Sequence, residues 1–214
     1  MSSKVIGVHS VQEEYFYLMV HRCACGGAWF SDEQKFEDAD GRFRHDVKAR
    51  CAACGKERAF HFELPEESKR DRSAPVRQIN PTAEPSRAVD LAEWMDLARF
   101  YLARIERLKA PVERAQSLLD ARQCLDEALK FYGPEDDAPP PEALWSDESQ
   151  RKVAADPDAY RRAALEAMLE KMPSRNRLRQ ADAPDQREFE KALKAEARRR
   201  VGRRWWQFWK RRNV

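Results

Sequence analysis

Two pairs of cysteines constrain the first third of this 214-residue chain. One residue separates Cys23 from Cys25, two residues separate Cys51 from Cys54, and a glycine directly follows each pair. Two closely spaced cysteines can direct both sulfurs at one metal ion, and two such pairs supply the four ligands of a structural zinc site. The glycines favour this interpretation, because a turn after the second ligand needs a positive φ that glycine adopts without a clash. We therefore predict that Cys23, Cys25, Cys51 and Cys54 bind a structural Zn2+ ion.

Three other interpretations of the cysteines stay open at this point, namely two disulfides, four unrelated buried thiols and a catalytic zinc. Disulfides require an oxidising compartment, and no long apolar run follows Met1 to predict a secretory signal. A catalytic zinc keeps one position for water, whereas four cysteines fill every position. All four histidines lie in the same third of the chain: His9, His21, His45 and His61. Because the sequence lacks a histidine–glutamate metalloprotease or deaminase signature, we interpret them as strand residues on a half-exposed face.

Apolar runs on both sides of the cysteine pairs predict short strands joined by an Asp-Gly hairpin turn at 38–42. The predicted strands are 15–20, 28–30, 43–49 and 59–64. With this order of strands and cysteine turns, residues 14–64 resemble a zinc ribbon, over about a quarter of the chain. The second cysteine pair, followed by Gly55 and Lys56, matches the family pattern, whereas the first pair is one residue shorter. The resemblance implies a small β domain organised around structural zinc.

Beyond the cysteines the spacing of apolar residues predicts helices. We expect Ser86 to cap the first helix and Pro111 to begin a second one, so that the two helices form a hairpin. Ser146 is expected to cap a short helix, and Pro157 to begin a helix that continues to Met172.

The sequence thus predicts an α+β fold, in which a small N-terminal β zinc ribbon is followed by an all-α helical domain and a C-terminal amphipathic helix. The predicted segments are the zinc ribbon at 1–64, a linker at 65–85, the helical domain at 86–173, a second linker at 174–186 and a basic, aromatic helix at 187–214.

The C-terminal segment differs from the rest of the chain in charge and in aromatic content. Residues 187–214 contain 11 Lys and Arg against 3 Asp and Glu, although the net charge of the whole chain is only +3. Three of the chain's six tryptophans lie within five residues of this segment, and each exposes a large apolar area unless a partner covers it. The predicted partner-binding residues are Arg198, Arg199, Arg200, Arg203, Arg204, Trp205, Trp206, Phe208, Trp209, Lys210, Arg211 and Arg212.

An arginine-rich helix with tryptophans suits an anionic membrane surface or the groove of a protein partner. Nucleic acid is a weaker prediction, because the rest of the chain has no basic stripe. The sequence shows no phosphate-binding loop, no serine nucleophile motif and no evident small-molecule site, and we interpret Cys124 as a small core residue. No apolar stretch of 18 residues predicts a membrane span.

We therefore expect a non-enzymatic, zinc-binding adaptor in the cytoplasm, peripheral to the inner membrane face if its partner is lipid. The alternatives are a nucleic-acid-binding zinc-ribbon protein and a zinc enzyme of unknown reaction. The first predicts binding that weakens steeply as salt rises. The second predicts a zinc ion with three protein ligands and a water.

Overall fold

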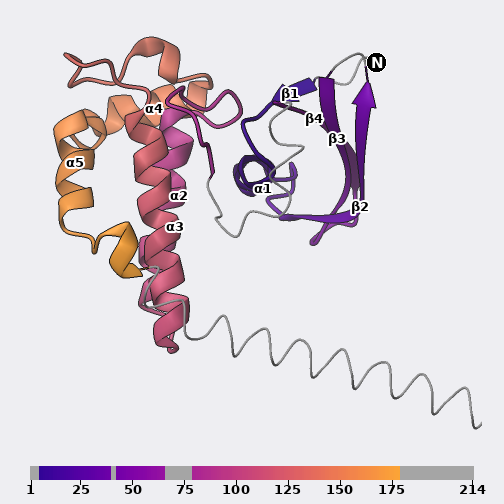
Figure 1. Cartoon of the computed structure of the whole chain (residues 1–214), viewed down its shortest axis with the longest axis horizontal. Helices are drawn as coiled ribbons and strands as arrows, with labels where there is room; N and C mark the ends of the chain where they lie inside the picture. The colour runs from indigo at the N-terminus through magenta and orange to yellow at the C-terminus, as the bar shows by residue number, and fades with distance from the viewer. Residues whose placement is uncertain (1–4, 40–41, 66–78, 179–214) are drawn as a thin grey trace, which may run out of the picture.

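A computed structural model of the chain describes residues 5–39, 42–65 and 79–178. A four-stranded sheet forms the N-terminal part and helices form the rest, so that the mixed α+β class is confirmed (Figure 1). The C-terminal helix predicted at 187–214 lies outside the described residues.

The sheet contains three antiparallel strands and one short parallel strand. Strands β2 (Trp29–Ala39), β3 (Arg42–Cys51) and β4 (Glu57–Leu64) follow one another, and β1 (Val5–Gly7) pairs in parallel with β4, in the order β1-β4-β3-β2. Side chains of β3 and β4 alternate between inside and outside, as a half-buried strand requires. The inward side chains are Phe43, His45, Val47, Ala49, Phe60, Phe62 and Leu64.

Strand β2 is the outer strand of the described sheet on the side away from β1. Its register with β3 shifts between Ser31 and Glu33, which marks a β-bulge. Asp32, Glu33 and Lys35 of this strand are exposed.

The strand predicted at 15–20 is wrong, because these residues belong to helix α1 (Val11–Val20). Ser10 caps this helix: its hydroxyl oxygen accepts a hydrogen bond from the backbone N–H of Glu13 at 3.1 Å. Glu13 and Glu14 occupy the first turn, where negative side chains favour a helix. Phe16 is 1% exposed, and its ring contacts those of Trp94 and Tyr101. Packing against these distant residues therefore also stabilises the helix.

Helices α2 (Leu91–Ile105) and α3 (Pro111–Leu129) pack against each other as the predicted hairpin. Pro111 begins α3 as predicted, but the predicted N-cap of the first helix is wrong. Asp90 caps α2 in a capping box with Glu93, while Ser86 accepts hydrogen bonds from two backbone N–H groups in the turn before the helix. The sequence signal at Ser86 therefore marks a turn that leads into the helix.

The remaining helices are short. Residues Pro141–Ala143 form the 3-10 turn η3, and Ser146 caps α4 (Asp147–Ala155) as predicted. The single helix predicted from Pro157 is wrong, because the chain forms the 3-10 turn η4 (Pro157–Tyr160) and then α5 (Arg162–Glu170). The two are separate because Arg161 has an extended backbone, with φ −71° and ψ 143°.

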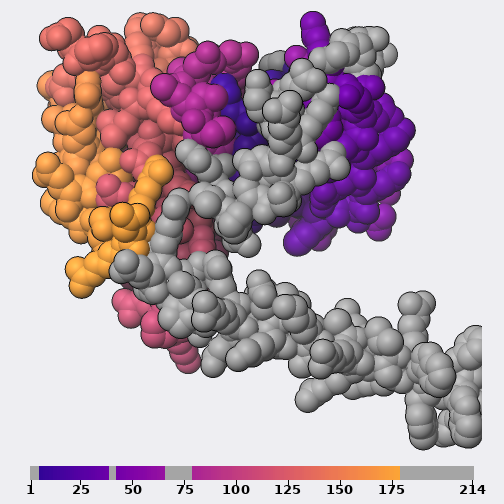
Figure 2. Space-filling model, in the orientation of Figure 1, coloured from indigo at the N-terminus to yellow at the C-terminus, as the bar shows by residue number. Residues whose placement is uncertain are grey.

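The sheet and the helices share one hydrophobic core. Helix α1 lies between the sheet and the α2–α3 pair, and its Phe16 ring centroid is 5.5 Å from that of Trp94 (Figure 1). Cys124 is fully buried in this core, which confirms its predicted role as a small core residue. In the space-filling view the sheet and the helices occupy opposite ends of the molecule, with the magenta segment after Ile79 between them (Figure 2).

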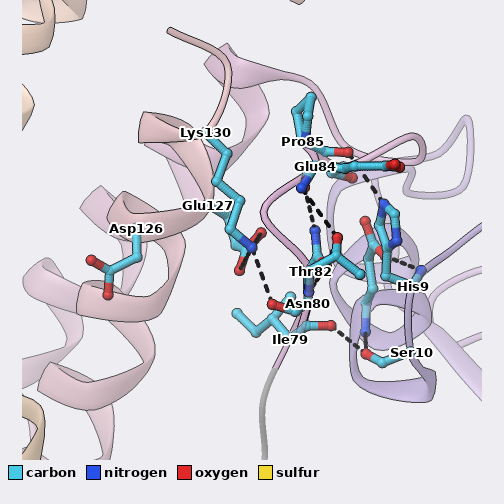
Figure 3. Close-up of polar contacts among 12 residues, drawn as sticks. His9, Ser10, Ile79, Asn80, Thr82, Glu84, Pro85, Asp126, Glu127 and Lys130 are labelled. Carbon is cyan, nitrogen blue, oxygen red and sulfur yellow. Dashed lines mark hydrogen bonds and ion pairs between the residues drawn. The ribbon is translucent and has the colours of Figure 1, made fainter. Parts of the chain in front are cut away.

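A polar junction fixes the same arrangement beside the core (Figure 3). The Ser10 hydroxyl donates to the Ile79 carbonyl, and a ring nitrogen of His9 lies 3.2 Å from the Pro85 carbonyl oxygen. From the other side, the Lys130 ammonium group donates to the Asn80 carbonyl at 3.1 Å. Residues 79–85, the described end of the segment predicted as a linker, are thereby held between α1 and α3.

Candidate metal centre

Two cysteine turns meet at one end of the sheet, and we call them the knuckles. Knuckle 1 (residues 23–27) joins α1 to β2, and knuckle 2 (residues 51–56) joins β3 to β4. The start of β2 lies beside the end of β3, because Trp29 pairs with Cys51 in the antiparallel register. The sheet itself therefore brings together two cysteine pairs that are distant in sequence.

The four cysteine sulfurs form a compact cluster, within 4.8 Å of one another. Sulfur atoms of Cys23 and Cys54 are 3.7 Å apart, and those of Cys25 and Cys51 are 3.5 Å apart. A disulfide bond would place its two sulfurs about 2.05 Å apart, so the geometry is that of four free thiols. Among the described residues this is the only group of three or more metal-ligand side chains within metal-binding distance of one another, and it is compatible with a zinc ribbon.

Both knuckles turn on backbone hydrogen bonds and a glycine with positive φ. In knuckle 1 the N–H of Cys23 donates to the Gly27 carbonyl at 3.1 Å, and in knuckle 2 the N–H of Cys51 donates to the Lys56 carbonyl at 2.9 Å. Gly26 has φ 82° and Gly55 has φ 72°, in the region that only glycine occupies readily. The missing residue in the first cysteine pair therefore does not prevent the same kind of turn.

Gly27 serves a different purpose, because its neighbours leave no room for a side chain. A Cβ atom at this position would lie 2.4 Å from the Cys51 sulfur and 2.8 Å from the Ala53 Cβ. Both distances are shorter than any normal van der Waals contact. Glycine at this position lets knuckle 1 approach the sulfur of knuckle 2.

The four cysteines differ in exposure, and the pKa values of two of them are shifted in opposite directions. Cys23 and Cys51 are buried, whereas Cys25 and Cys54 are exposed. Backbone N–H groups of Cys54 and Ala53 point at the Cys51 sulfur and lower its pKa to about 6. The backbone N–H of Gly27 also lowers the pKa of Cys25, but the three neighbouring sulfurs outweigh it and raise the pKa to about 12. A positive charge among the four sulfurs would favour the deprotonation that their mutual proximity opposes.

The four histidines make contacts away from the cysteine cluster. His21 lies at the end of α1, where its ring nitrogen is 3.3 Å from the Ala88 carbonyl oxygen and 3.7 Å from the Glu93 carboxylate. His61 is a half-exposed strand residue, as predicted, and its Nδ1 lies beside the Asp46 carboxylate. His9 and His45 are buried, so the prediction of a half-exposed face is wrong for them, and the prediction of strand residues is wrong for His9 and His21, which lie outside the strands.

Sequence reasoning missed the partner of His45. Its Nδ1 lies 2.5 Å from a carboxylate oxygen of Glu14, and both side chains are buried. The alternation of Phe43, His45 and Val47 places the histidine on the inner face and is a readable signal. The contribution of Glu14 becomes visible only once residues 11–20 are known to form a helix.

The predicted partner-binding residues from Arg198 to Arg212 lie outside the described residues. No described helix combines the length and the apolar character that a membrane crossing requires. No protein-family model, curated protein or solved structure matches the chain.

Proposed function

We propose that this chain is a zinc-binding adaptor in which the metal has a structural role. The observation that carries the proposal is the cluster of four cysteine sulfurs. A tetrahedral zinc ion with Zn–S bonds of about 2.3 Å would hold its sulfurs about 3.8 Å apart. The Cys23–Cys54 and Cys25–Cys51 distances of 3.7 and 3.5 Å are close to this value.

The donor set supports a structural ion over a catalytic one. Cys23, Cys25, Cys51 and Cys54 would fill all four coordination positions, leaving none for water or substrate. When bound, zinc supplies the positive charge that four neighbouring thiolates need. The protein contributes the backbone N–H groups of Ala53 and Cys54, which stabilise a thiolate at Cys51, and the absence of a side chain at Gly27, which lets the two knuckles approach each other.

The adaptor part of the proposal rests on residues 198–212. Eight Lys and Arg flank three tryptophans and a phenylalanine there, a composition that suits an anionic membrane surface. Each cation near such a surface contributes about 1 kcal/mol of attraction. In this proposal the C-terminal segment docks on the lipid, while the zinc-stabilised sheet and the helices form the body that it carries.

Elemental analysis tests the metal. We expect one zinc per chain in protein purified without added metal, and substantially less in the Cys51→Ser variant. Cys124→Ala is the matched control, because Cys124 is buried in the core away from the cluster, and this variant should retain its zinc. A metal-free wild-type protein, or disulfides between these cysteines, would overturn the proposal.

Vesicle sedimentation tests the docking. The full chain should bind vesicles of phosphatidylcholine with phosphatidylserine and should bind pure phosphatidylcholine weakly. Deletion of residues 198–214 should abolish the difference between the two. If the full chain shows no preference for the anionic vesicles, membrane docking is excluded and a protein partner becomes the remaining form of the adaptor proposal.

A further inference from the structure

An apolar stripe of α1 lines a groove between this helix, the sheet and the α2–α3 pair. The groove has a volume of about 540 Å3, within the range of roughly 300–1,000 Å3 that is usual for binding pockets. Val11, Tyr15 and Leu18 follow one another at intervals of four and three residues, which places them on one face of α1. Val11 is 46% exposed and Tyr15 is 55% exposed. A contiguous apolar stripe in a groove marks an interaction surface.

The other walls of the groove are polar. Gln116 and Asp120 of α3 line it, and the amide of the first donates to the carboxylate of the second at 2.8 Å. A carboxylate and an amide oxygen can each accept more than one hydrogen bond. Arg104 of α2 also lines the groove and is exposed, so its guanidinium plane can stack on an aromatic face. The walls therefore suit a large apolar ring with a single N–H donor, which is the chemistry of an indole.

The described part of the chain ends beside this groove. Leu178, the last described residue, is buried against Ala115 and Leu119 of α3. Gln116 and Asp120, which line the groove, are the next residues along the helix after these two. The remainder of the chain therefore starts close to the rim of the groove.

The chain beyond this point is long enough to return to the groove and contains the indoles to fill it. Residues 179–197 separate Leu178 from the basic, aromatic segment. A stretch of this length spans roughly 28 Å as a helix and more when extended, so it does not restrict the approach. Trp205, Trp206 and Trp209 follow, and each needs a surface that covers its apolar area.

We propose that the groove binds the chain's own C-terminal segment, through at least one indole of Trp205, Trp206 and Trp209. The ring would lie against Val11 and Tyr15, with its N–H directed to the polar walls. These tryptophans cannot occupy the groove and a membrane at once, so the groove would hold the segment back until anionic lipid competes for it. This competition rests on the proposed lipid docking, whereas the contact with the groove does not.

NMR spectroscopy of the full, zinc-loaded chain tests the contact. We expect nuclear Overhauser effects between the ring protons of Tyr15 and an indole of residues 205–209, with the same intensity per chain after tenfold dilution. Absence of these effects would overturn the proposal. Effects that weaken on dilution would place the segment in the groove of a second copy, and would overturn the intramolecular contact.

A pair of variants in the full chain sharpens the test. Tyr15→Ser removes the most exposed ring of the stripe, and it should cause loss of the Overhauser effects between the Val11 methyl groups and the indole. Phe30→Ser is the matched control, because Phe30 of β2 is 63% exposed and does not line the groove, and this variant should retain them. Both side chains are largely in solvent, so both proteins should fold. Undiminished effects in Tyr15→Ser would contradict the proposal, and if that variant does not fold, the contacts of the wild-type chain still decide.

Sedimentation with phosphatidylserine vesicles tests the competition separately. Release of the segment in Tyr15→Ser should increase the affinity for these vesicles by about threefold or more, while Phe30→Ser should bind as the wild type does. Equal affinities of Tyr15→Ser and the wild type would show that the groove does not compete with lipid. If none of the three proteins binds the vesicles, the proposed lipid docking fails, and the contacts measured by NMR still decide whether the groove holds the segment.

Discussion

Cys25 and Cys54 are exposed at the knuckle end of the sheet, whereas Trp94 and Met95 of α2 are completely buried. The knuckles contain small residues and glycines that bury little apolar area, so under the zinc proposal their shape depends on the metal ion. The α2–α3 pair depends on apolar burial, of which one large side chain contributes about 1.5–3 kcal/mol. Under the zinc proposal, one molecule combines a region that folds around a ligand with a region that folds around its own core. Variants in each region can test how far the knuckles and the α2–α3 pair fold independently of each other.

The largest effect is expected from loss of the metal. Cys51→Ser should abolish tight zinc binding, which in structural sites is worth about 10 kcal/mol or more. Hydrogen exchange should show loss of amide protection in residues 23–27 and 51–56, with the α2 amides still protected. Simultaneous loss of protection in α2 would show that the helices cannot fold without the zinc centre.

The reciprocal change is Trp94→Ala in the helical region. Removing a completely buried tryptophan should reduce the free energy of unfolding by about 3–5 kcal/mol, measured by urea denaturation with zinc present. Trp145→Ala is the control, because Trp145 is 47% exposed and its removal should cost about 1 kcal/mol or less. The folded Trp94→Ala protein should still bind one zinc, and loss of zinc from it would mean that the core positions the knuckles.

A smaller effect is expected at the contact between the knuckles. Gly27→Ala would place a Cβ 2.4 Å from the Cys51 sulfur, so one knuckle must move away from the other. We expect zinc affinity to fall by about tenfold or more, measured in competition with a chelator. Gly7→Ala is a matched control, because the nearest atom to its new Cβ would be 4.0 Å away. Equal affinities for the two variants would mean that the knuckles adjust without cost.

The smallest expected effect is that of pH on stability, and the sign of this effect differs between the two regions. Burial raises the pKa of Glu14 from 4.5 to about 7 against the opposing effect of His45, and the charge of Glu13 adds to the rise. The folded state therefore retains a proton that the unfolded state releases, and stability is lost as pH rises from about 5 to 7. Acid has the opposite effect on the knuckles, since protonated thiols release zinc.

Urea midpoints measured across this interval at saturating zinc test the sign. We expect the free energy of unfolding to decrease by on the order of 1 kcal/mol through Glu14 alone. Glu14→Gln should flatten the decrease in part, because burial also raises the pKa of Glu93 and of Glu127 to about 7. An identical slope in the variant would show that Glu14 does not titrate in this interval.

Features encoded by neighbouring residues could be predicted from the sequence. The cysteine spacing and the glycines indicated the cysteine cluster, and Pro111 and Ser146 marked the start and the cap of their helices because these effects act within one turn. The sequence also separated the sheet from the helices, since the hydrophobic periodicity changes between them.

Features that depend on distant contacts could not be predicted. Residues 15–20 are an unbroken apolar run without a clear period, and they form a helix because Ser10 caps it and Phe16 packs against Trp94. The same error concealed the Glu14–His45 pair, because a strand at 15–20 does not bring Glu14 to β3. The wrong assignment of one helix thus concealed a buried polar contact between that helix and the sheet.

The bulge and the charges of β2 have a consequence for solubility. An outer strand presents unpaired backbone groups that can recruit another chain and start aggregation. The shift in register after Ser31 and the exposed Asp32, Glu33 and Lys35 oppose such recruitment, because they distort the hydrogen-bonding edge and place charge along it. At the opposite edge of the sheet the outer strand is β1, which is only 3 residues long and therefore offers a short template for pairing with another chain.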